Sequence, residues 1–571
     1  METLPRNVWK RLARLFPAGD EASARAAELF REYESDGVLS RPTAQLVGLD
    51  LPVVADFFRR VSLMHSIESP ILRRRDTRWM SEYDYTWVNI RAAGLEQKPG
   101  TFLSASMALA ALRTKGLILA PATRGAGEDL RALESHAVLR DELADRRAVD
   151  AGAGPELQMA AFCEAAHLLG LVLGYELDYR VDPLAAVVLN RPELFRWTKN
   201  GGYDPAEEVQ DELRDEVRSR VASVRKAGAP AQREVFAGAL DVVGLAARPA
   251  EDGSGRTPLA LRLGGPGSEH REEAVAYWGR VFDHWRDRYG FDFLVLRGSG
   301  GAEAESGESP DRSLVRKAAD AARKAGVRRN IGVAAEGGAF DVESYGVQGV
   351  DLVLEDGSED KADYAWFERT FALDEKLRRV NLGRKLRFSV PLEVNPGEVE
   401  SRPRRERALI KRFVARFLGT GPSRRPLLET MGALEGAWGF EGSISRAASL
   451  GWMPDAGDAA KARRLEAVAE EYRDMRDGGE RLDKHLGARS AWWVIRSRRG
   501  LLIAVVSVEN EDLLPPEPLR IDYAAYLKDN ESMTVLEYDF QEDRGLLQLS
   551  SDTLIDIEGV PYRGFRLYSV T

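Results

Sequence analysis

The sequence predicts an α/β protein: a (β/α)8 TIM barrel with a helical N-terminal extension, an insertion after the third strand and a C-terminal antiparallel β-sandwich. Three observations support this prediction. Between residues 84 and 487, short apolar runs alternate with helical segments, which is typical of βα units around a buried parallel sheet. About eight such units suit a barrel, and one long polar stretch interrupts them. Residues 488–571 contain apolar and alternating runs with no long helix between them.

The composition limits the function classes. Of 571 residues, 44% are hydrophobic and 30% are charged, so a large packed core is possible and wholesale disorder is excluded. The net charge of −10 argues against a general nucleic-acid binder, which needs a basic face. The single cysteine, Cys163, excludes an intrachain disulfide and a thiolate-rich metal site. Because no apolar run suits a signal peptide or a membrane span, we expect a cytoplasmic protein without a membrane partner.

The first segment, residues 1–83, has a helical pattern. Trp9, Leu12, Leu15 and Phe16 recur at the spacing of one helix face. Several prolines divide the segment into short pieces. We therefore expect a helical extension ahead of the barrel.

The barrel is expected over residues 84–487, with its insertion at about 183–275. The insertion combines a charged helical segment with a polar, glycine-rich stretch. A second low-complexity segment, residues 298–313, follows the fourth strand candidate, and its composition suggests mobility. The eight strand candidates are residues 85–90, 116–121, 171–177, 291–297, 330–336, 350–354, 386–393 and 425–430.

The last segment, residues 488–571, is expected to form the β-sandwich, packed on the barrel. Its runs are apolar or alternate in hydropathy, and turns such as Arg499-Gly500 separate them. The runs are residues 491–495, 501–508, 534–540, 546–549 and 565–570.

Three local motifs and their order resemble the α-amylase superfamily, glycoside hydrolase family 13. Residues 162–173 (FCEAAHLLGLVL) resemble the helix that leads into the third strand of that family. Residues 190–197 (NRPELFRW) resemble a segment that follows it in the maltosyltransferase and trehalose-synthase branches. Residues 289–292 (YGFD) resemble the entry to the fourth strand. The resemblance covers about residues 84–571 and implies a barrel enzyme of carbohydrate metabolism acting on α-glucans.

The resemblance places the family's reactive groups at the carboxyl ends of the third, fourth, fifth and seventh strands. Retaining hydrolysis there requires a carboxylate nucleophile and a carboxylic acid. At the matching positions this sequence has Glu176 for the third-strand aspartate, Arg297 for the nucleophile, Glu336 for the general acid/base, and Asn395 at the start of the seventh-strand motif. A guanidinium group cannot attack an anomeric carbon and repels an oxocarbenium-like transition state. Of the family's three catalytic carboxylates, which are the nucleophile, the general acid/base and the seventh-strand aspartate, only the general acid/base has a matching carboxylate here, Glu336.

Other residues near the strand ends are candidates for ligand contact or for core packing. Tyr175 and Trp197 lie near strand ends, where each could stack on a sugar ring or pack in the core. Asp292 precedes Arg297 by five residues and falls on the opposite face of the strand, so it cannot replace the nucleophile. The six histidines show no metal-site spacing, and no phosphate-binding or nucleotide motif is present, so we expect neither a metal nor a cofactor.

Two hypotheses follow from these residues. The first is a pseudoenzyme that binds a glycan, a sugar phosphate or a protein partner at the barrel mouth, with Glu336 paired to Arg297. Glu176, Arg297 and Glu336 should then share one cavity at that mouth. The alternative is an active α-glucan hydrolase, or a glucosyl or maltosyl transferase, with a rearranged site that uses Glu336 and a carboxylate not matched above.

Overall fold

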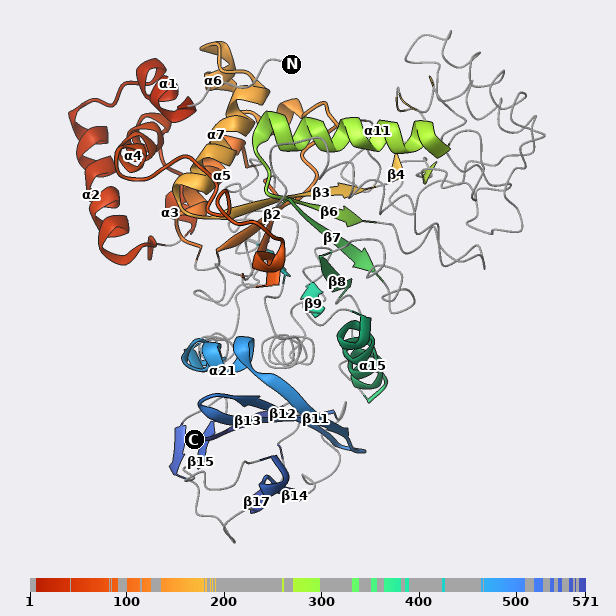
Figure 1. The fold of residues 1–571 in the computed structure, drawn as a ribbon. Coiled ribbons are helices and arrows are strands. Elements are labelled where there is room, and N and C mark those ends of the chain that lie inside the picture. Colours follow the sequence, from red (N-terminus) through yellow and green to blue (C-terminus); the bar gives the residue numbers. More distant parts are fainter. Residues whose placement is uncertain are drawn as a thin grey trace, which may run out of the picture. The chain divides into compact units, whose positions relative to one another are not determined.

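The structure is a computed structural model, shown in Figure 1. Two compact units are present, Met1–Trp79 with Trp87–Val353, and Met80–Thr86 with Leu354–Thr571, and each is described separately. Most of the expected insertion and the whole of 298–313 lie outside the described residues. The described residues are 7–41, 43–81, 83, 85–90, 100–112, 115–124, 135–178, 180–181, 185, 187, 190, 259–260, 271–297, 331–337, 351–356, 364–380, 386–389, 424–426, 464–465, 467–508, 518–526, 535–538, 543–546, 554–557, 560 and 564–571.

Eight strands form one sheet whose order, β1-β10-β9-β8-β7-β6-β3-β2, is that of a closed barrel. The pairs β2–β3, β3–β6, β6–β7 and β9–β10 are parallel, which confirms the predicted parallel sheet. Each strand overlaps or adjoins one of the eight apolar runs identified in the sequence. Their bounds are β1 Tyr85–Val88, β2 Gly116–Leu119, β3 Val172–Asp178, β6 Phe293–Arg297, β7 Gly332–Gly337, β8 Leu352–Asp356, β9 Leu386–Ser389 and β10 Arg424–Pro426.

A buried helix, α7 (Pro155–Leu168), leads into β3. Gly154 is its N-cap and Pro155 takes the first helical position, where the missing N–H costs nothing. Every residue from Leu157 to Leu168 is buried, because other elements surround the helix on all sides. The neighbouring helices of this unit are α5 (Phe102–Leu109), α6 (Arg146–Asp150) and α11 (Arg271–Asp283), which continues as the π-helix η8 (His284–Arg288).

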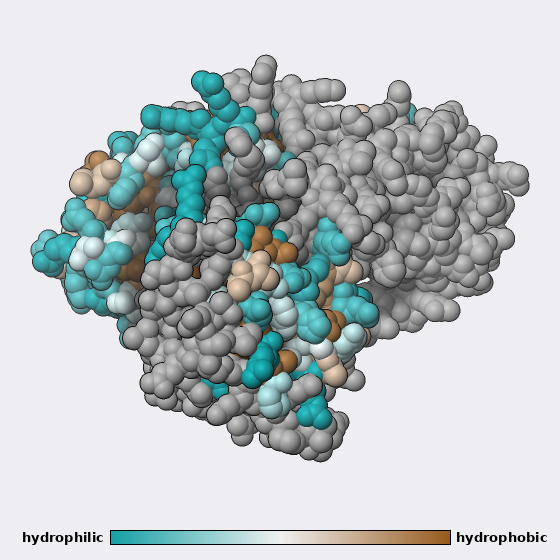
Figure 2. Space-filling view, turned by 60° about the horizontal axis from the view of Figure 1, so that its bottom comes forward, coloured by the Kyte–Doolittle hydropathy of each residue, from teal (hydrophilic) through white to brown (hydrophobic). Residues whose placement is uncertain are grey.

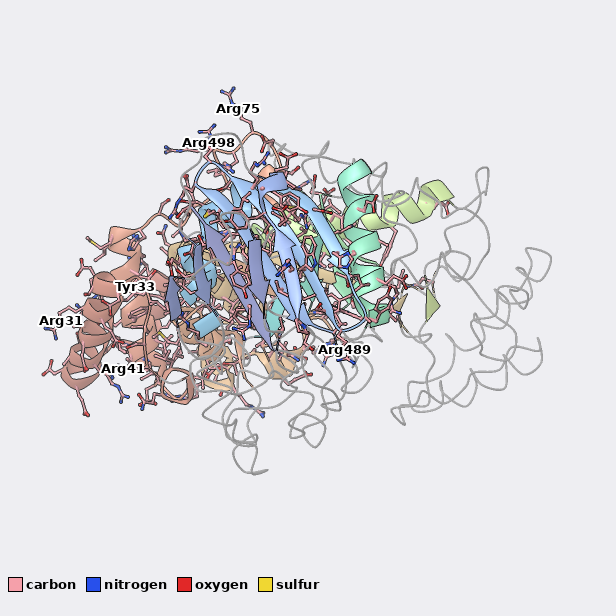
Figure 3. All side chains as sticks on the ribbon, turned by 90° about the horizontal axis from the view of Figure 1, so that it is seen from below. Arg31, Tyr33, Arg41, Arg75, Arg489 and Arg498 are labelled. Carbon is pink, nitrogen blue, oxygen red and sulfur yellow. The ribbon has the colours of Figure 1, made fainter. Side chains whose placement is uncertain are left out.

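The described residues ahead of the barrel contain four helices: α1 (Val8–Leu15), α2 (Asp20–Asp36), α3 (Thr43–Val47) and α4 (Leu51–Met64). Tyr33 lies on the α4 side of α2, edge-on to Phe57 with ring centroids 6.1 Å apart, whereas Arg31 extends away (Figure 3). Trp9 of α1 is fully buried and stacks on Phe58 at 4.4 Å between centroids. Its indole N–H donates to the Ala161 carbonyl of α7 at 2.7 Å. Trp9 therefore anchors the helical segment to α7.

We expect Trp9→Ala to lower the free energy of unfolding by about 3 kcal/mol, because it removes a large buried ring and leaves a cavity. Urea denaturation followed by far-UV circular dichroism measures the change. Leu15→Ala, on the same helix but 39% exposed, is the matched control and should change the value by less than about 1 kcal/mol. Equal effects of the two substitutions would contradict the anchoring role.

The amino end of α1 is capped from a distant part of the chain. Asn7 precedes the helix in the left-handed region, at φ 65°, and its side chain caps nothing. Instead, the Glu164 carboxylate of α7 accepts hydrogen bonds from the backbone N–H groups of Val8 at 2.9 Å and Trp9 at 3.2 Å. A carboxylate there satisfies two otherwise unpaired donors and interacts favourably with the helix dipole.

Burial raises the pKa of the Glu164 carboxyl, although the backbone N–H groups that it accepts act in the opposite direction. The folded state therefore binds this proton more tightly than the unfolded state. The resulting stabilisation is complete below the unfolded pKa and is lost as the pH rises through the folded pKa. We expect Glu164→Gln to gain stability relative to the unmodified protein between about pH 4 and pH 7. Urea midpoints across that range measure it, and parallel pH profiles would contradict the prediction.

The second unit contains a six-stranded sheet of order β11-β12-β13-β18-β15-β16 and a two-stranded sheet, β14–β17. The strand pairs described in both sheets are antiparallel, as predicted for the last segment. The first strand begins at Glu480, ahead of the expected boundary at 488. The bounds are β11 Glu480–Leu486, β12 Ser490–Ser497, β13 Gly500–Ser507, β14 Leu519–Asp522, β15 Val535–Tyr538, β16 Asp543–Leu546, β17 Leu554–Ile557 and β18 Phe565–Val570.

The two faces of the six-stranded sheet have different neighbours within this unit. One face shares a hydrophobic core with β14 and β17, in which Val494 and Ile503 are clustered with Ile521 and Ile555. The other face carries Trp493, which lies edge-on to Phe371 of α15 (Tyr364–Val380), with ring centroids 6.1 Å apart. The sheet is thus covered on both sides, and its central strands are apolar for that reason.

No helix among the described residues combines the length and apolarity that a membrane crossing requires. In the view of Figure 2, hydrophilic residues cover most of the described surface, and hydrophobic residues form small separate groups.

Candidate functional site

Two neighbouring residues of β3 establish which face of the sheet is which. Tyr175 stacks on Trp285 of η8, with ring centroids 3.7 Å apart, so it lies on the outer, helix-covered face. Gly174 lies on the other face, where a Cβ atom would meet the Phe293 ring at 2.2 Å. Because successive residues of a strand alternate between faces, Glu176 and Asp178 share the inner face with Gly174.

The register then aligns inner-face positions of three strands in rows. The first row is Gly174, Phe293 and Gly332, and the second is Glu176, Val295 and Ala334. In the third row, Asp178 is the cross-strand partner of Arg297. The pairing of β6 and β7 extends to Leu296 with Ala335, and Glu336 is the next residue of β7, as Arg297 is of β6. We call Asp178, Arg297 and Glu336 the Arg297 row.

Glu176 is a carboxylate inside an apolar layer. Its exposed fraction is 0%, and its row partners Val295 and Ala334 are equally buried. A carboxyl group is rarely buried in such surroundings without a polar partner, and Glu176 has one. Glu176, which the sequence analysis names as the site position on the third strand, is therefore a buried acid on the inner face.

Arg297 and Glu336 occupy the strand positions that the sequence predicted for them. Arg297 is the last residue of β6, in the sheet and not in the helical layer, and Glu336 is the penultimate residue of β7. Both fall on the inner face by alternation from Phe293 and Gly332. The three predicted positions thus share one face near the carboxyl ends of their strands, and a common cavity remains a prediction.

Tyr175 is packed in the protein core. It is 1% exposed, and its hydroxyl oxygen accepts the Ala122 backbone N–H at 3.2 Å. Burial raises the pKa of this phenol above its usual value. Of the two roles open from the sequence, its position on the outer face favours packing over stacking on a sugar. Trp197 and Asn395, also predicted to bind substrate, lie outside the described residues.

Asp292 lies at the opposite end of β6 from Arg297. Its carboxylate accepts the Leu173 backbone N–H at 2.9 Å and lies 3.3 Å from Nε2 of His167. Asp351 repeats this arrangement ahead of β8, accepting the Val333 N–H at 2.9 Å and the Thr77 hydroxyl at 2.6 Å. Both aspartates link the starts of neighbouring strands, so Asp292 has a structural role and is not a substitute nucleophile.

Asp178 is the one residue of the Arg297 row that the sequence analysis missed. Glu176 and Asp178 lie two residues apart at the end of an apolar strand. This spacing indicates that both acids lie on the same face of the strand. The family motif on this strand has one acidic position, which matches Glu176 and not Asp178. The register of β3 with β6 shows that the next inner-face position is also acidic.

Neither a metal site nor a reactive thiol is found in the described part of the chain. No group of three His, Cys, Asp or Glu side chains there is arranged to hold a metal ion. Cys163 is buried, and its pKa is raised well above the usual value, first by burial and then by the charge of Asp292. A thiol of that kind is a poor nucleophile.

Comparison with solved structures shows that the chain shares the fold of the α-amylases. An α-amylase from Geobacillus thermoleovorans in complex with acarbose matches with a TM-score of 0.52 and 10% identity over 87% of this chain and 99% of its own. Trehalose-6-phosphate hydrolase from Bacillus licheniformis matches with a TM-score of 0.52 and 9% identity, over 86% of this chain and 100% of its own. An inactive double mutant of MutB in complex with isomaltulose matches with a TM-score of 0.54 and 10% identity, over 86% of this chain and 99% of its own. No family model and no curated protein matches the sequence.

Proposed function

We propose that this protein is a non-catalytic glycan-binding protein built on the α-amylase fold. In this proposal, a (β/α)8 barrel at 84–487 carries the insertion at about 183–275 and the ligand site at its mouth. Residues 1–83 form the helical extension and residues 488–571 form a C-terminal β-sandwich. The proposed ligand is an α-glucan, since a structural neighbour was solved with acarbose and another with isomaltulose.

One observation carries the proposal: a cation occupies the last inner-face position of β6, between acidic positions on β3 and β7. The resemblance places the nucleophilic carboxylate of the family at this position. Arg297 supplies neither a nucleophile nor a group that stabilises an oxocarbenium-like transition state. A neighbouring cation also favours the ionised form of a carboxyl group, whereas a general acid must hold its proton.

The test is binding measured together with turnover. Titration of maltoheptaose into the protein in a calorimeter should show saturable binding, and product analysis after prolonged incubation should show intact maltoheptaose. Glu336→Gln, at the carboxyl end of β7, should weaken binding, whereas Asp150→Asn, at the exposed end of α6, should not. Absence of any heat with maltoheptaose and with glycogen would overturn the proposal.

A second candidate function is hydrolysis by Glu336 and Asp178. Two strand spacings, roughly 9–10 Å, separate the Cα atoms of these positions. An inverting glycosidase uses two carboxylates that are far enough apart for a water molecule to lie between them and the sugar. Turnover of maltoheptaose with inversion at the anomeric carbon would support this candidate. Both Glu336→Gln and Asp178→Asn should then abolish it.

A further inference from the structure

Two helices attached to α7 carry an excess of exposed positive charge. Helices α1 and α6 together contain five basic residues and one acidic residue, Asp150, although the whole chain has a net charge of −10. One of the five, Lys10, is half-buried, and its charge acts on the carboxyl group of Glu164. The other four have exposed side chains, and we call them the basic patch: Arg11, Arg14, Arg146 and Arg147.

Helix α7 holds α1 and α6 at neighbouring positions. The Trp9 indole of α1 donates to the Ala161 carbonyl at 2.7 Å. Gln158 donates its side-chain N–H to the carbonyl of Asp145, the N-cap of α6, at 3.0 Å, and accepts the Asp145 backbone N–H at 2.7 Å. Gln158 and Ala161 are three residues apart, so the two attachment points are separated by about 4.5 Å along α7. The two helices therefore contribute to one region of the surface.

The basic patch is not neutralised by the part of the chain that the structure describes. Three other arginines of the helical segment have carboxylate partners. Arg41 pairs with Glu32 at 3.0 Å, and Arg59 and Arg60 both pair with Asp56, at 2.6 and 2.9 Å. Within the described residues, none of the four patch arginines forms an ion pair. Their charge is therefore available to a binding partner.

The stability of the helices does not explain this placement of charge. Arg146 is the first residue of α6, where a cation is unfavourable beside the positive end of the helix dipole. Asp150, the last residue, is an anion at the negative end. The carboxylate of the N-cap, Asp145, accepts the Ala148 N–H at 3.0 Å. A charge order that opposes the dipole favours a role of the arginines in binding.

The same two helices also expose aliphatic side chains. Leu15 at the end of α1 is 39% exposed, and Val149 of α6 is 40% exposed. Exposed apolar side chains rimmed by charged ones are typical of protein interaction sites, where arginine is also enriched. The patch therefore fits a partner that is both acidic and partly apolar.

The charge of the whole chain limits the length of that partner. Charges are screened over about 8 Å at physiological salt, so a short acidic segment interacts mainly with the patch itself. A long polyanion such as a nucleic acid would also meet the rest of a chain whose net charge is −10. The charges thus favour a short protein segment over a nucleic acid.

We propose that the basic patch, together with Leu15 and Val149, is a docking surface for an acidic, leucine-containing segment of a partner protein. Both helices lie outside the barrel sheet, so the inference is independent of the ligand proposed for the barrel mouth. Arg11 and Arg147 supply one cation from each helix and are the pair to reverse first.

The probe is a short fluorescein-labelled peptide of alternating glutamate and leucine residues, titrated with the full chain and followed by fluorescence anisotropy. Saturable binding is expected in low-salt buffer. Arg11→Glu combined with Arg147→Glu should weaken it at least about tenfold, and Arg14→Gln combined with Arg146→Gln should also weaken it. The matched control reverses Arg25 and Arg31 of α2, a helix with six acidic and two basic residues, and should change affinity less than about twofold. Arg31 extends away from its neighbours (Figure 3).

A second peptide, with serine in place of leucine, tests the apolar contact. Leu15→Ala should weaken binding of the leucine peptide about threefold and leave the serine peptide unchanged. Absence of saturable binding, or equal weakening by the α2 control, would overturn the inference. So would tighter binding of a short DNA duplex than of the peptide. Self-association in sedimentation velocity that the Arg11 and Arg147 reversal abolishes would overturn it too, because a second copy would then cover the patch.

Discussion

The Arg297→Asp variant should show no measurable turnover of α-glucosides, although it returns a carboxylate to the position of the family's nucleophile. The resemblance places two further losses beside it. Val295, two residues earlier on the same face, stands where the family has an arginine, and residues 395–397 replace the seventh-strand Asn-His-Asp motif without its histidine and aspartate. A positioned acid, base or charge-stabilising group contributes about 10²–10⁴-fold each. Losing several together places the expected rate below detection.

Release of 4-nitrophenol from an activated α-glucoside is the sensitive readout for this variant. The unmodified protein and Arg297→Asp combined with Glu336→Gln, purified in parallel, control for contaminating glucosidases. Turnover that is present in Arg297→Asp and absent from the combined variant would contradict the prediction. It would also show that Glu336 and the new carboxylate are sufficient for catalysis.

The strands of the barrel could be predicted because burial on both faces makes them continuous apolar runs. The runs at 171–177 and 291–297 correspond closely to β3 and β6. The same property hides which residue faces which side, since apolar residues occupy both faces. That is why Tyr175 could be assigned to a sugar site or to the core from the sequence, and the structure was needed to place it against Trp285.

The register of the sheet could not be predicted from the sequence either. Asp178 becomes notable only because β3 and β6 pair in a register that brings it opposite Arg297. The cap on α1 is a similar case, since Glu164 lies 156 residues from Val8 and no local pattern connects them. The start of β11 at Glu480 was missed because its side chains are mostly polar and none is fully buried.

A short sequence repeat marks the starts of two barrel strands. Residues 290–293 (GFDF) and 349–352 (GVDL) share the pattern Gly-x-Asp followed by an apolar strand. In the structure, Asp292 and Asp351 each accept a backbone N–H from the neighbouring strand. This pattern therefore marks the starts of two strands and explains both aspartates without any catalytic role.

Gly174→Val should destabilise the protein more than any other substitution considered above, because the first row of the inner face has no room for a side chain. A Cβ atom at position 174 would lie 2.2, 2.3 and 2.6 Å from three carbon atoms of the Phe293 ring. That ring is fully buried and lies edge-on to buried Trp79, with centroids 5.9 Å apart, so it cannot swing aside without disturbing a second ring. The expected loss exceeds about 5 kcal/mol, enough to prevent folding of most domains.

Because Gly174→Val is expected not to fold, the quantitative test uses Gly174→Ala, whose single methyl group meets the same ring. We expect a loss of about 3 kcal/mol in urea denaturation. The matched control is Gly19→Ala, since a Cβ atom there meets nothing within 4 Å, and its effect should stay below about 1 kcal/mol. Combining Gly174→Ala with Phe293→Leu should recover part of the loss, because the smaller side chain frees the space that the methyl group needs. Strictly additive losses would show that the Phe293 ring does not fill this space. The assignment of Gly174 to the inner face would then be wrong. The face assignments of Glu176 and Asp178, which depend on it, would be wrong as well.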